Sequence, residues 1–309
     1  MDADVNKKKD KKCAPGKKYD NISCFSIESL KTIAKEYNNA NNKNNAINIT
    51  NDKKELVNQI YNKFKNKCST QTCWLKTDIV KNIKNDEIHK HTFRPVGPNA
   101  KFGWLSTTNI NDVIEQYEKL HDNFLFLGTV PYDFQEILEL GFNNFNFEKE
   151  YSNGKTKLGM VINLDESHQS GSHWVALYAD LKDNKVYFFD SVGKPPRKKI
   201  KKFINKIINY LYKKHQQLLI SVGDIINIIN KIEKKKIKLE YFTNLFNILK
   251  DFDIRYNNIQ HQFKDSECGV YSINFIIRLV KGESFDEIIK NITTDDKMNE
   301  CRQVYFNNT

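Results

Sequence analysis

The sequence lacks any long uninterrupted apolar run, and among its 309 residues glycine (12), proline (6) and tryptophan (3) are scarce. No apolar stretch approaches the ~18 residues that a membrane span requires, which excludes a transmembrane class. Residues 1–18 are polar and rich in lysine, so no secretory signal is expected there. Acidic residues are also in deficit, at 38 against 49 basic ones, and the net charge of +11 favours an acidic partner.

Cysteine is sparse as well, with six residues in all: Cys13, Cys24, Cys68, Cys73, Cys268 and Cys301. In a chain without a secretory signal, such thinly spread cysteines are expected to be free thiols in a reducing compartment. A zinc site built from Cys68, Cys73, His89 and His91 is the alternative. Its spacing matches no known pair of zinc knuckles, so we expect no metal and no cofactor.

The N-terminal third of the chain is predicted to be a basic tail followed by a small helical region. Residues 1–20 hold seven lysines, which is typical of a disordered tail. Helical periodicity then appears from Ser26 to about Tyr37, and again over residues 54–64. Residues 21–95 are therefore expected to form a helical interaction domain, and the segment 89–98, with two prolines and a glycine, is expected to be the linker.

Residues 96–309 show a mixed pattern, which predicts one larger domain. The strand-like runs are 157–164, 173–181, 185–192 and 254–256. The helix-like runs are 110–120, 134–140 (with Asp133 as N-cap and Gly141 after its end), a basic helix after Pro196, and 221–250. A basic helical insertion is thus expected at about 197–250. Because the strands are grouped in the middle with helices on either side, the fold class is predicted to be α+β.

One cysteine stands where a polar loop becomes an apolar helix, which is the position expected of a nucleophile. Cys268 falls at the helix N-terminus, where unpaired N–H groups and the helix dipole favour a thiolate. His173 and Asp190 lie at adjacent ends of two strands joined by a hairpin, so the carboxylate is expected to orient the imidazole. Gln262 could donate to an oxyanion. The alternative is that these residues never meet, but four suitable types in suitable places favour catalysis.

The runs that carry a family resemblance are His173-Trp174, Asp190-Ser191, Gln262 and Cys268-Gly269-Val270-Tyr271. Over roughly residues 100–290 they resemble the ubiquitin-like-protein proteases and the adenovirus endopeptidase. The spacings of seventeen residues from His173 to Asp190 and six from Gln262 to Cys268 are similar to those of the SUMO-protease branch. The resemblance implies a papain-like-clan core with a central mixed sheet flanked by helices. It also implies His173 as base, Asp190 as orienter, Cys268 as nucleophile and Gln262 as oxyanion donor.

Some features depart from that branch. The loop before Cys268 carries Lys264-Asp265 and Glu267 where the family often has Asn-Gly and Asp, and the interval after Asp190 is long. With the basic helical N-terminal extension, the chain resembles more closely the polyprotein-processing thiol proteases of large DNA viruses, the African swine fever virus enzyme included. This resemblance favours virion precursor proteins over SUMO conjugates as substrates, and a location in the host cytoplasm, a viral factory or the virion.

The resemblance also implies a substrate-binding role for Trp104 and Trp174. In the family, tryptophans at matching positions wall a narrow tunnel that admits only glycine before the scissile bond. The alternative for both is ordinary core packing. The basic run 197–214, with residues 1–18, could bind nucleic acid without sequence preference, although a solvated helix face is the default interpretation.

The sequence therefore predicts a monomeric cysteine endopeptidase that cleaves protein substrates after Gly-Gly-type sequences. Two alternatives stay open. One is an isopeptidase that removes a SUMO-like or ubiquitin-like modifier. The other, from a different class, is a catalytically silent basic protein that binds nucleic acid or serves as a scaffold, which the intact set of four residues disfavours.

Overall fold

The computed structural model describes residues 12–216 and 252–307, and these form two compact units. The first unit contains the described residues up to 101 together with 115–120 and those from 300 onward, and the second contains 102–114 and the described residues of 121–299. The predicted helix over 221–250 and most of the predicted basic tail lie outside the described residues. That residues 21–95 and 96–309 are separate domains, each able to fold independently, stays a prediction.

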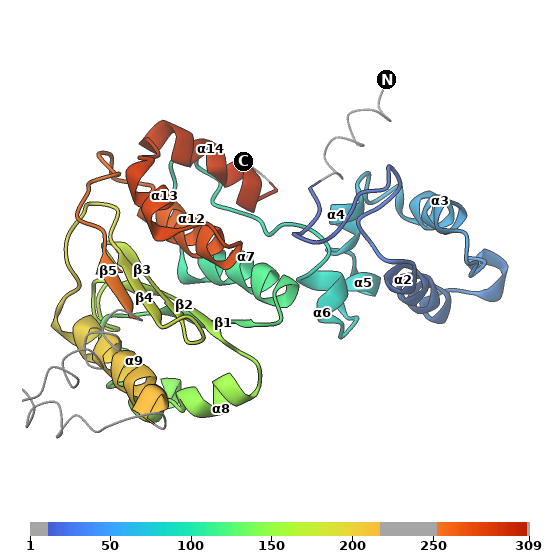
Figure 1. The fold of residues 1–309 in the computed structure, drawn as a ribbon. Coiled ribbons are helices and arrows are strands. Elements are labelled where there is room, and N and C mark those ends of the chain that lie inside the picture. Colours follow the sequence, from blue (N-terminus) through green and yellow to red (C-terminus); the bar gives the residue numbers. More distant parts are fainter. Residues whose placement is uncertain (1–11, 217–251, 308–309) are drawn as a thin grey trace, which may run out of the picture. The chain divides into compact units, whose positions relative to one another are not determined.

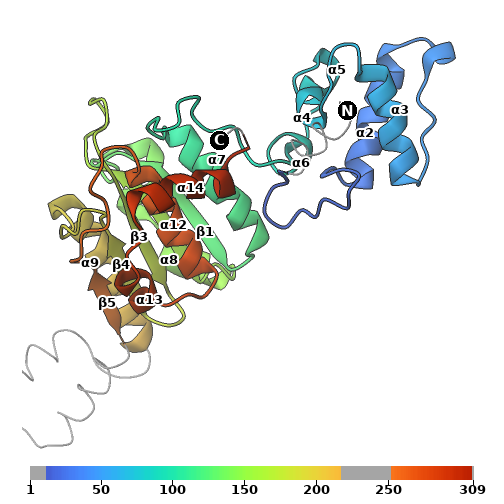
Figure 2. The same cartoon turned by 90° about the horizontal axis from the view of Figure 1, so that it is seen from above.

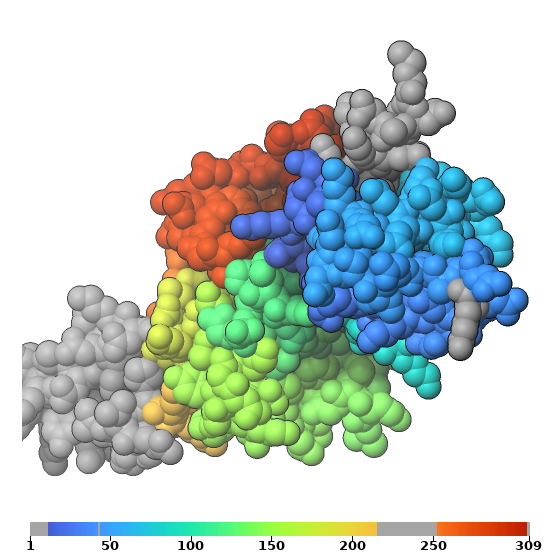
Figure 3. Space-filling view, turned by 90° about the vertical axis from the view of Figure 1, so that its right-hand side faces the viewer, coloured from blue at the N-terminus to red at the C-terminus, as the bar shows by residue number. Residues whose placement is uncertain are grey.

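The first unit is helical, as its sequence pattern predicts. Its helices are α2 (Ile27–Ala40), α3 (Lys53–Phe64), α4 (Gln71–Trp74), α5 (Asp78–Lys81) and α6 (Asp86–His89), with a 3₁₀ turn η1 (Lys43–Asn45). Ser26 caps α2 by accepting from Ser29 N, and Asp52 caps α3 in the same way. The helices α2 and α3 lie side by side (Figures 1 and 2). Their apolar faces pack around Trp74, and the unit forms the closely packed blue and cyan body in Figure 3.

Four of the six cysteines form disulfides, so the expectation of free thiols is wrong for them. Cys13 is bonded to Cys24 and Cys68 to Cys73, with Cα–Cα distances of 5.4 and 5.5 Å. The chain folds back within each pair and brings the two Cα atoms into bonding range, which sequence spacing alone cannot show. The inference of a reducing compartment loses its support, because it rested on free cysteines. Cys268 and Cys301 form no disulfide.

Two segments that were predicted to lack structure are part of the first unit. Cys13 forms a β-bridge with Phe93, and Ala14 N donates to Thr92 O at 3.0 Å. The tail prediction is therefore wrong for residues 12–20. The predicted linker is ordered as well, since Phe93 is buried and Arg94 N donates to the carbonyl of Lys12. Residues 12–14 and 92–94 are thus hydrogen-bond partners for each other's backbone. The local sequence of either segment does not reveal this pairing.

The second unit is built on a five-stranded mixed sheet in the order β1-β2-β3-β4-β5. The strands are β1 (Phe124–Val130), β2 (Lys157–Asn163), β3 (Trp174–Asp180), β4 (Lys185–Phe189) and β5 (Asp253–Tyr256). The three central strands pair antiparallel, and the two outer ones pair parallel to their neighbours. The four predicted strands are confirmed. The sequence analysis missed β1, whose short apolar run follows directly on a helix.

Helices cover both faces of this sheet (Figure 1). On one face lie α12 (Cys268–Val280) and α13 (Phe285–Lys290), and Phe275 of α12 stacks on Phe189 of β4 with ring centroids 4.7 Å apart. On the other face, α8 (Phe147–Ser152) and α9 (Lys198–Gln216) enclose a core that contains Leu177, Phe188 and Phe203. Alternate strand residues thus bury on opposite faces, which explains the near-continuous apolar runs. The predicted α+β class is confirmed, as is the predicted helix after Pro196, whose Ile200 and Phe203 are buried.

The remaining elements show one agreement and one correction. The predicted helix before the sheet is α7 (Thr107–Leu120), and α14 (Asp295–Tyr305) follows α13. The helix predicted over residues 134–140 is wrong: turns lead into two 3₁₀ segments, η2 (Leu138–Leu140) and η3 (Phe142–Asn144). Asp133 does not cap a helix there, because its carboxylate accepts from the backbone N and hydroxyl of Ser167 at 2.9 and 2.7 Å. Gly141 has φ +70°, the left-handed conformation predicted for it.

No described helix is both long and apolar enough to cross a membrane.

Candidate active site

His173 and Asp190 meet across the β3–β4 hairpin, as their spacing predicts. His173 directly precedes β3 and Asp190 directly follows β4, and the antiparallel register pairs Ala176 with Phe189. The His173 Nε2 and Asp190 Oδ1 atoms are 2.7 Å apart. Asp190 is 2% exposed, and it also accepts from Val192 N at 3.0 Å. A buried carboxylate held in this way fixes the orientation of the imidazole ring.

Cys268 is the first residue of α12 and lies within hydrogen-bonding reach of the same imidazole. Its thiol is 7% exposed, and the residue before it, Glu267, makes no side-chain cap to the helix. Burial lowers the pKa of His173, but its hydrogen bonds to Asp190 and to Cys268 raise it, and the net result is a pKa of about 9. The imidazole therefore favours its protonated form at neutral pH, which stabilises a neighbouring thiolate.

Gln262 lies in the loop before α12, where it is 4% exposed, and its side-chain amide is fixed at both ends. The hydroxyl of Ser191 donates to Gln262 Oε1 at 2.6 Å, and Gln262 Nε2 donates to the carbonyl of Lys264 at 2.5 Å. Because Oε1 accepts from Ser191, the NH₂ group must face the other way. The loop itself is anchored by Asp295, whose carboxylate accepts from Phe263 N and Lys264 N. The oxyanion role of Gln262 stays a prediction.

Asn257 is a residue of this site that the sequence analysis missed. Its Oδ1 accepts from Asp190 N at 2.8 Å, while its Nδ2 donates to Asp190 O at 2.7 Å and to Ile259 O at 3.0 Å. Asn257 is 1% exposed and directly follows β5, which pairs in parallel with β4. The side chain of Asn257 bonds to the backbone of Asp190, the residue directly after β4, and so extends this pairing. A polar residue after a short strand is the only local signal, and it does not reveal a partner 67 residues away.

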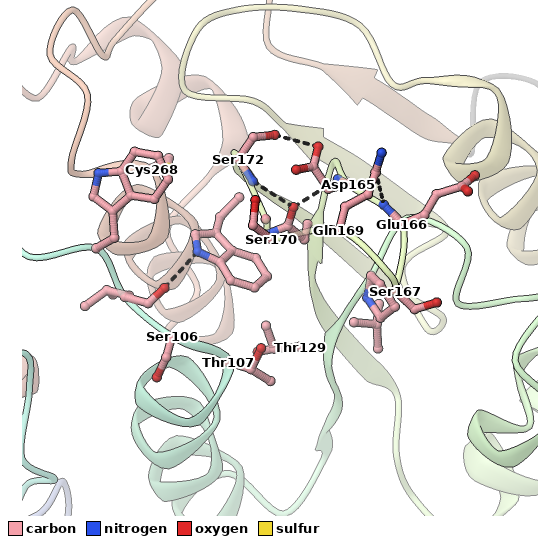
Figure 4. Close-up of a pocket in the computed structure, with 17 residues that line it drawn as sticks. Ser106, Thr107, Thr129, Asp165, Glu166, Ser167, Gln169, Ser170, Ser172 and Cys268 are labelled. Atoms are coloured by element: carbon pink, nitrogen blue, oxygen red, sulfur yellow. Dashed lines mark hydrogen bonds between the residues drawn. The ribbon is translucent and has the colours of Figure 1, made fainter.

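Trp104 and Trp174 line one cleft of about 570 Å³ together with Cys268. Trp174 Nε1 donates to the carbonyl of Leu105 at 3.0 Å, which fixes its indole, and Trp104 is 57% exposed. Gly269 lies against Leu105, where an added Cβ would be 3.1 Å from the leucine Cβ. The structure thus brings both tryptophans to the candidate nucleophile, and a role in substrate binding is compatible with this position. Figure 4 shows Cys268, Ser106 and Thr107 around the cleft.

The loop between β2 and β3 forms the polar side of this cleft (Figure 4). Ser172 Oγ donates to Asp165 at 2.7 Å, and Ser172 N and Asp165 N both donate to Asn163 Oδ1. Gly171 has φ +87°, and a Cβ there would be 2.8 Å from Asn163 Nδ2, so only glycine fits. This network fixes the chain directly before His173.

Several known proteins are similar to this chain. The model of the Ulp1 protease family, C-terminal catalytic domain, matches residues 155–308. A protein of Acanthamoeba polyphaga mimivirus, named as a candidate thiol protease, is 33% identical over 96% of this chain and 93% of its own length. A SUMO-1 cysteine protease of African swine fever virus is 23% identical over 82% of this chain and 88% of its own.

The fold has a solved counterpart. The crystal structure of the African swine fever virus protease has a TM-score of 0.60 to this chain at 20% identity, and the match covers 96% and 95% of the two chains. This likeness extends the fold agreement beyond the segment that the family model matches. Together with the identity to the mimivirus relative along nearly the whole of both chains, these matches show that this chain belongs to the Ulp1 family of cysteine proteases.

Proposed function

We propose that this chain is an endopeptidase that cleaves viral precursor proteins after Gly-Gly-type sequences, with Cys268 as nucleophile, His173 as base and Asp190 as orienter. The observation that carries the proposal is the arrangement of three groups. His173 Nε2 lies 2.7 Å from Asp190 Oδ1, and Cys268, which raises the pKa of the same imidazole, lines a cleft with two tryptophans. A thiol, a base and an orienting group in this order are what acyl transfer to cysteine requires.

The reaction follows from these positions. In the resting pair, His173 already holds the proton of the Cys268 thiol, because its raised pKa favours the imidazolium, and the thiolate attacks the carbonyl carbon of the scissile amide. The oxyanion that forms accepts from Gln262 and from backbone N–H groups at the start of α12. The His173 imidazolium then protonates the leaving amine, the C–N bond breaks, and an acyl-enzyme remains. Water, deprotonated by His173, hydrolyses the thioester and restores Cys268.

The pKa of His173 gives a test of this assignment by pH. The imidazolium is the proton donor to the leaving amine, so kcat/KM should fall as pH rises through about 9. Asp190→Asn removes the hydrogen bond that raises the pKa, and it should move this alkaline limb towards the ordinary histidine value. Because the folded-state pKa is raised, the linked stability is present below the unfolded pKa and is lost as pH rises through about 9. A pH profile that is the same in both proteins would contradict the assignment.

Asn257 is expected to act as a positioning residue for Asp190. Asn257→Leu removes both hydrogen bonds to the Asp190 backbone, so the carboxylate should lose its fixed position. We expect kcat to fall at least about tenfold and the alkaline limb of kcat/KM to move in the same direction as in Asp190→Asn.

A matched control for Asn257 exists in the first unit. Asn38 makes the same pair of bonds to the backbone of Ile47, donating to its carbonyl at 2.9 Å and accepting from its N at 2.7 Å. Asn38→Leu should lower the free energy of unfolding by about 1–3 kcal/mol without a change in the pH profile. If Asn38→Leu and Asn257→Leu shift the profile equally, Asn257 has only a structural role.

The second candidate function is removal of a ubiquitin-like modifier, and the name of the African swine fever virus relative, a SUMO-1 cysteine protease, favours it. A panel of Gly-Gly-X peptides assayed beside SUMO and ubiquitin fusions separates the two. The proposed function predicts that short peptides are cleaved with a kcat/KM comparable to that of the fusions. A preference of about 100-fold or more for one fusion would favour deconjugation instead. Failure to cleave any of them would favour the silent binding protein.

Nucleic acid remains a proposed partner through the basic surface of α9. Several lysines of this helix already have partners: Lys199 pairs with Glu136 and Glu166 at 2.9 and 2.7 Å, and Lys206 donates to backbone carbonyls. The exposed Lys201 and Lys202 still offer charge to a phosphate backbone. A monomeric state and a location in the viral factory or virion are likewise proposals.

A further inference from the structure

A second cavity lies next to the candidate catalytic pair, and it differs from the tryptophan cleft in its lining. This cavity, of about 470 Å³, is lined by His173 and Asp190 but not by Cys268. The cleft with Trp104 and Trp174 is lined by Cys268 but not by His173. The two cavities therefore share no lining residue, and Cys268 lines one of them while His173 and Asp190 line the other.

The chemistry of acyl transfer assigns one half of a substrate to each side. The carbonyl half becomes bonded to the Cys268 sulfur, so it must lie in the cleft that contains this residue. The amine half receives its proton from His173, so it must leave on the imidazole side. The cavity that His173 lines and Cys268 does not is therefore the candidate place for the residues that follow the scissile bond.

The charged groups that face this cavity are mainly basic. Lys194 and Arg197 line it, and neither has a carboxylate within 4 Å among the described residues. Arg197 Nη1 donates to the carbonyl of Leu164 at 3.0 Å, which holds the guanidinium at the cavity and leaves other N–H groups for a ligand. The one acidic group of the lining, Asp190, is engaged with His173.

The local backbone keeps these two cations in place. Pro195 and Pro196 separate Lys194 from Arg197, and proline rings restrict the backbone there. Gly193 has φ +75°, and a Cβ on it would be 3.0 Å from the backbone of Ile259, so this segment packs closely against the loop that leads to Gln262. The tryptophan cleft has the opposite charge, since its lining contains Asp165 and Glu166 and no lysine or arginine.

We infer that the cavity beside His173 selects an aspartate or glutamate as the second residue after the scissile bond, through Lys194 and Arg197. The inference rests on the proposed function, because it takes the cavity as the site of the leaving half. A carboxylate there gains charge-assisted hydrogen bonds from Arg197, whereas a lysine meets two like charges.

The test uses three peptides that differ at one position. Each ends its acyl half in Gly-Gly, and the second residue after the scissile bond is glutamate, glutamine or lysine. At low salt, kcat/KM should be about fivefold higher for glutamate than for glutamine and should be lowest for lysine, and the differences should shrink as salt screens these exposed charges. Equal kcat/KM for the three peptides, or a preference for lysine, would overturn the inference.

Charge reversal supplies the matched variants. Lys194→Glu/Arg197→Glu should invert the order of the three peptides. Lys201→Glu/Lys202→Glu, which makes the same change of charge at exposed positions of α9 outside the cavity, should leave the order unchanged. If Lys194→Glu/Arg197→Glu leaves the order of kcat/KM for the three peptides unchanged, or if Lys201→Glu/Lys202→Glu inverts it, the selection comes from the overall charge and not from this cavity.

Binding without turnover separates this inference from the proposed function. The affinities of the three intact peptides for Cys268→Ala protein report the selection in the absence of cleavage. If no peptide is cleaved by the wild-type protein but the glutamate peptide binds most tightly to Cys268→Ala, the proposed chemistry fails and the cavity's role stands. If the three peptides are cleaved with equal kcat/KM and bind to Cys268→Ala protein with equal affinity, the cavity does not select an acidic residue, but the proposed cleavage reaction stands.

Discussion

Cys268→Ala and His173→Ala should each lower kcat on a verified substrate by at least about 10⁴-fold, and the double variant should be no worse than either single one. The reason is that thiol and imidazole act as one unit: without His173 there is no base to generate the thiolate, and without Cys268 the base has nothing to activate. Single-turnover rates of the three variants, measured on the same Gly-Gly peptide, check this expectation.

The other cysteine outside the disulfides provides the control. Cys301→Ala removes this second thiol and should leave kcat within about twofold of the wild-type value, since Cys301 lies in α14 and lines neither cavity. Full turnover by Cys268→Ala, or an additive loss in the double variant, would show that the two residues do not act together.

Replacing the glycine directly before the scissile bond by alanine should lower kcat/KM at least about 30-fold, which corresponds to about 2 kcal/mol of transition-state binding. Trp174 is fixed by its hydrogen bond to Leu105 and cannot move aside cheaply. If Trp104 forms the facing wall, a methyl group has no room between the two indoles. Peptides with Gly-Gly, Gly-Ala and Ala-Gly before the bond measure the effect at each position.

A substitution in the protein that widens the proposed glycine tunnel tests the same prediction. Trp104 is 57% exposed, so Trp104→Ala should fold normally while it removes most of one wall. The variant should narrow the difference between Gly-Gly and Gly-Ala peptides to less than about fivefold. If Trp104→Ala protein keeps the full difference in kcat/KM between Gly-Gly and Gly-Ala peptides, or if the wild-type protein cleaves the two peptides equally, Trp104 and Trp174 do not form a glycine tunnel.

The parts of the site that could be predicted from sequence are those whose signal is local. Cys268 stands at a change from polar loop to apolar helix, and His173 and Asp190 flank a recognisable hairpin, so strand pairing alone brings the last two together. The strands β2, β3 and β4 are apolar over most of their length, with polar residues only at their ends, and this pattern also predicts them correctly.

What could not be predicted depends on long-range pairing. Asn257 meets Asp190 only because β5 pairs with β4, and nothing near Asn257 in sequence indicates which strand it will join. The same holds for the disulfides, where a turn and not a motif sets the distance between Cys13 and Cys24. Asp133 has the sequence context of an N-cap, yet its carboxylate accepts from the hydroxyl of Ser167 in a tertiary contact instead.

The most direct test of the central claim is to trap the nucleophile with a peptide that ends in Gly-Gly and carries an α,β-unsaturated methyl ester in place of its last carbonyl group. The thiolate adds to the double bond of this group and forms a stable thioether, which mass spectrometry locates. We predict one adduct per chain, on Cys268, formed at least about 100-fold more slowly in His173→Ala protein. An adduct on Cys301, or equal rates with and without His173, would contradict the claim that the Cys268 and His173 pair performs the reaction.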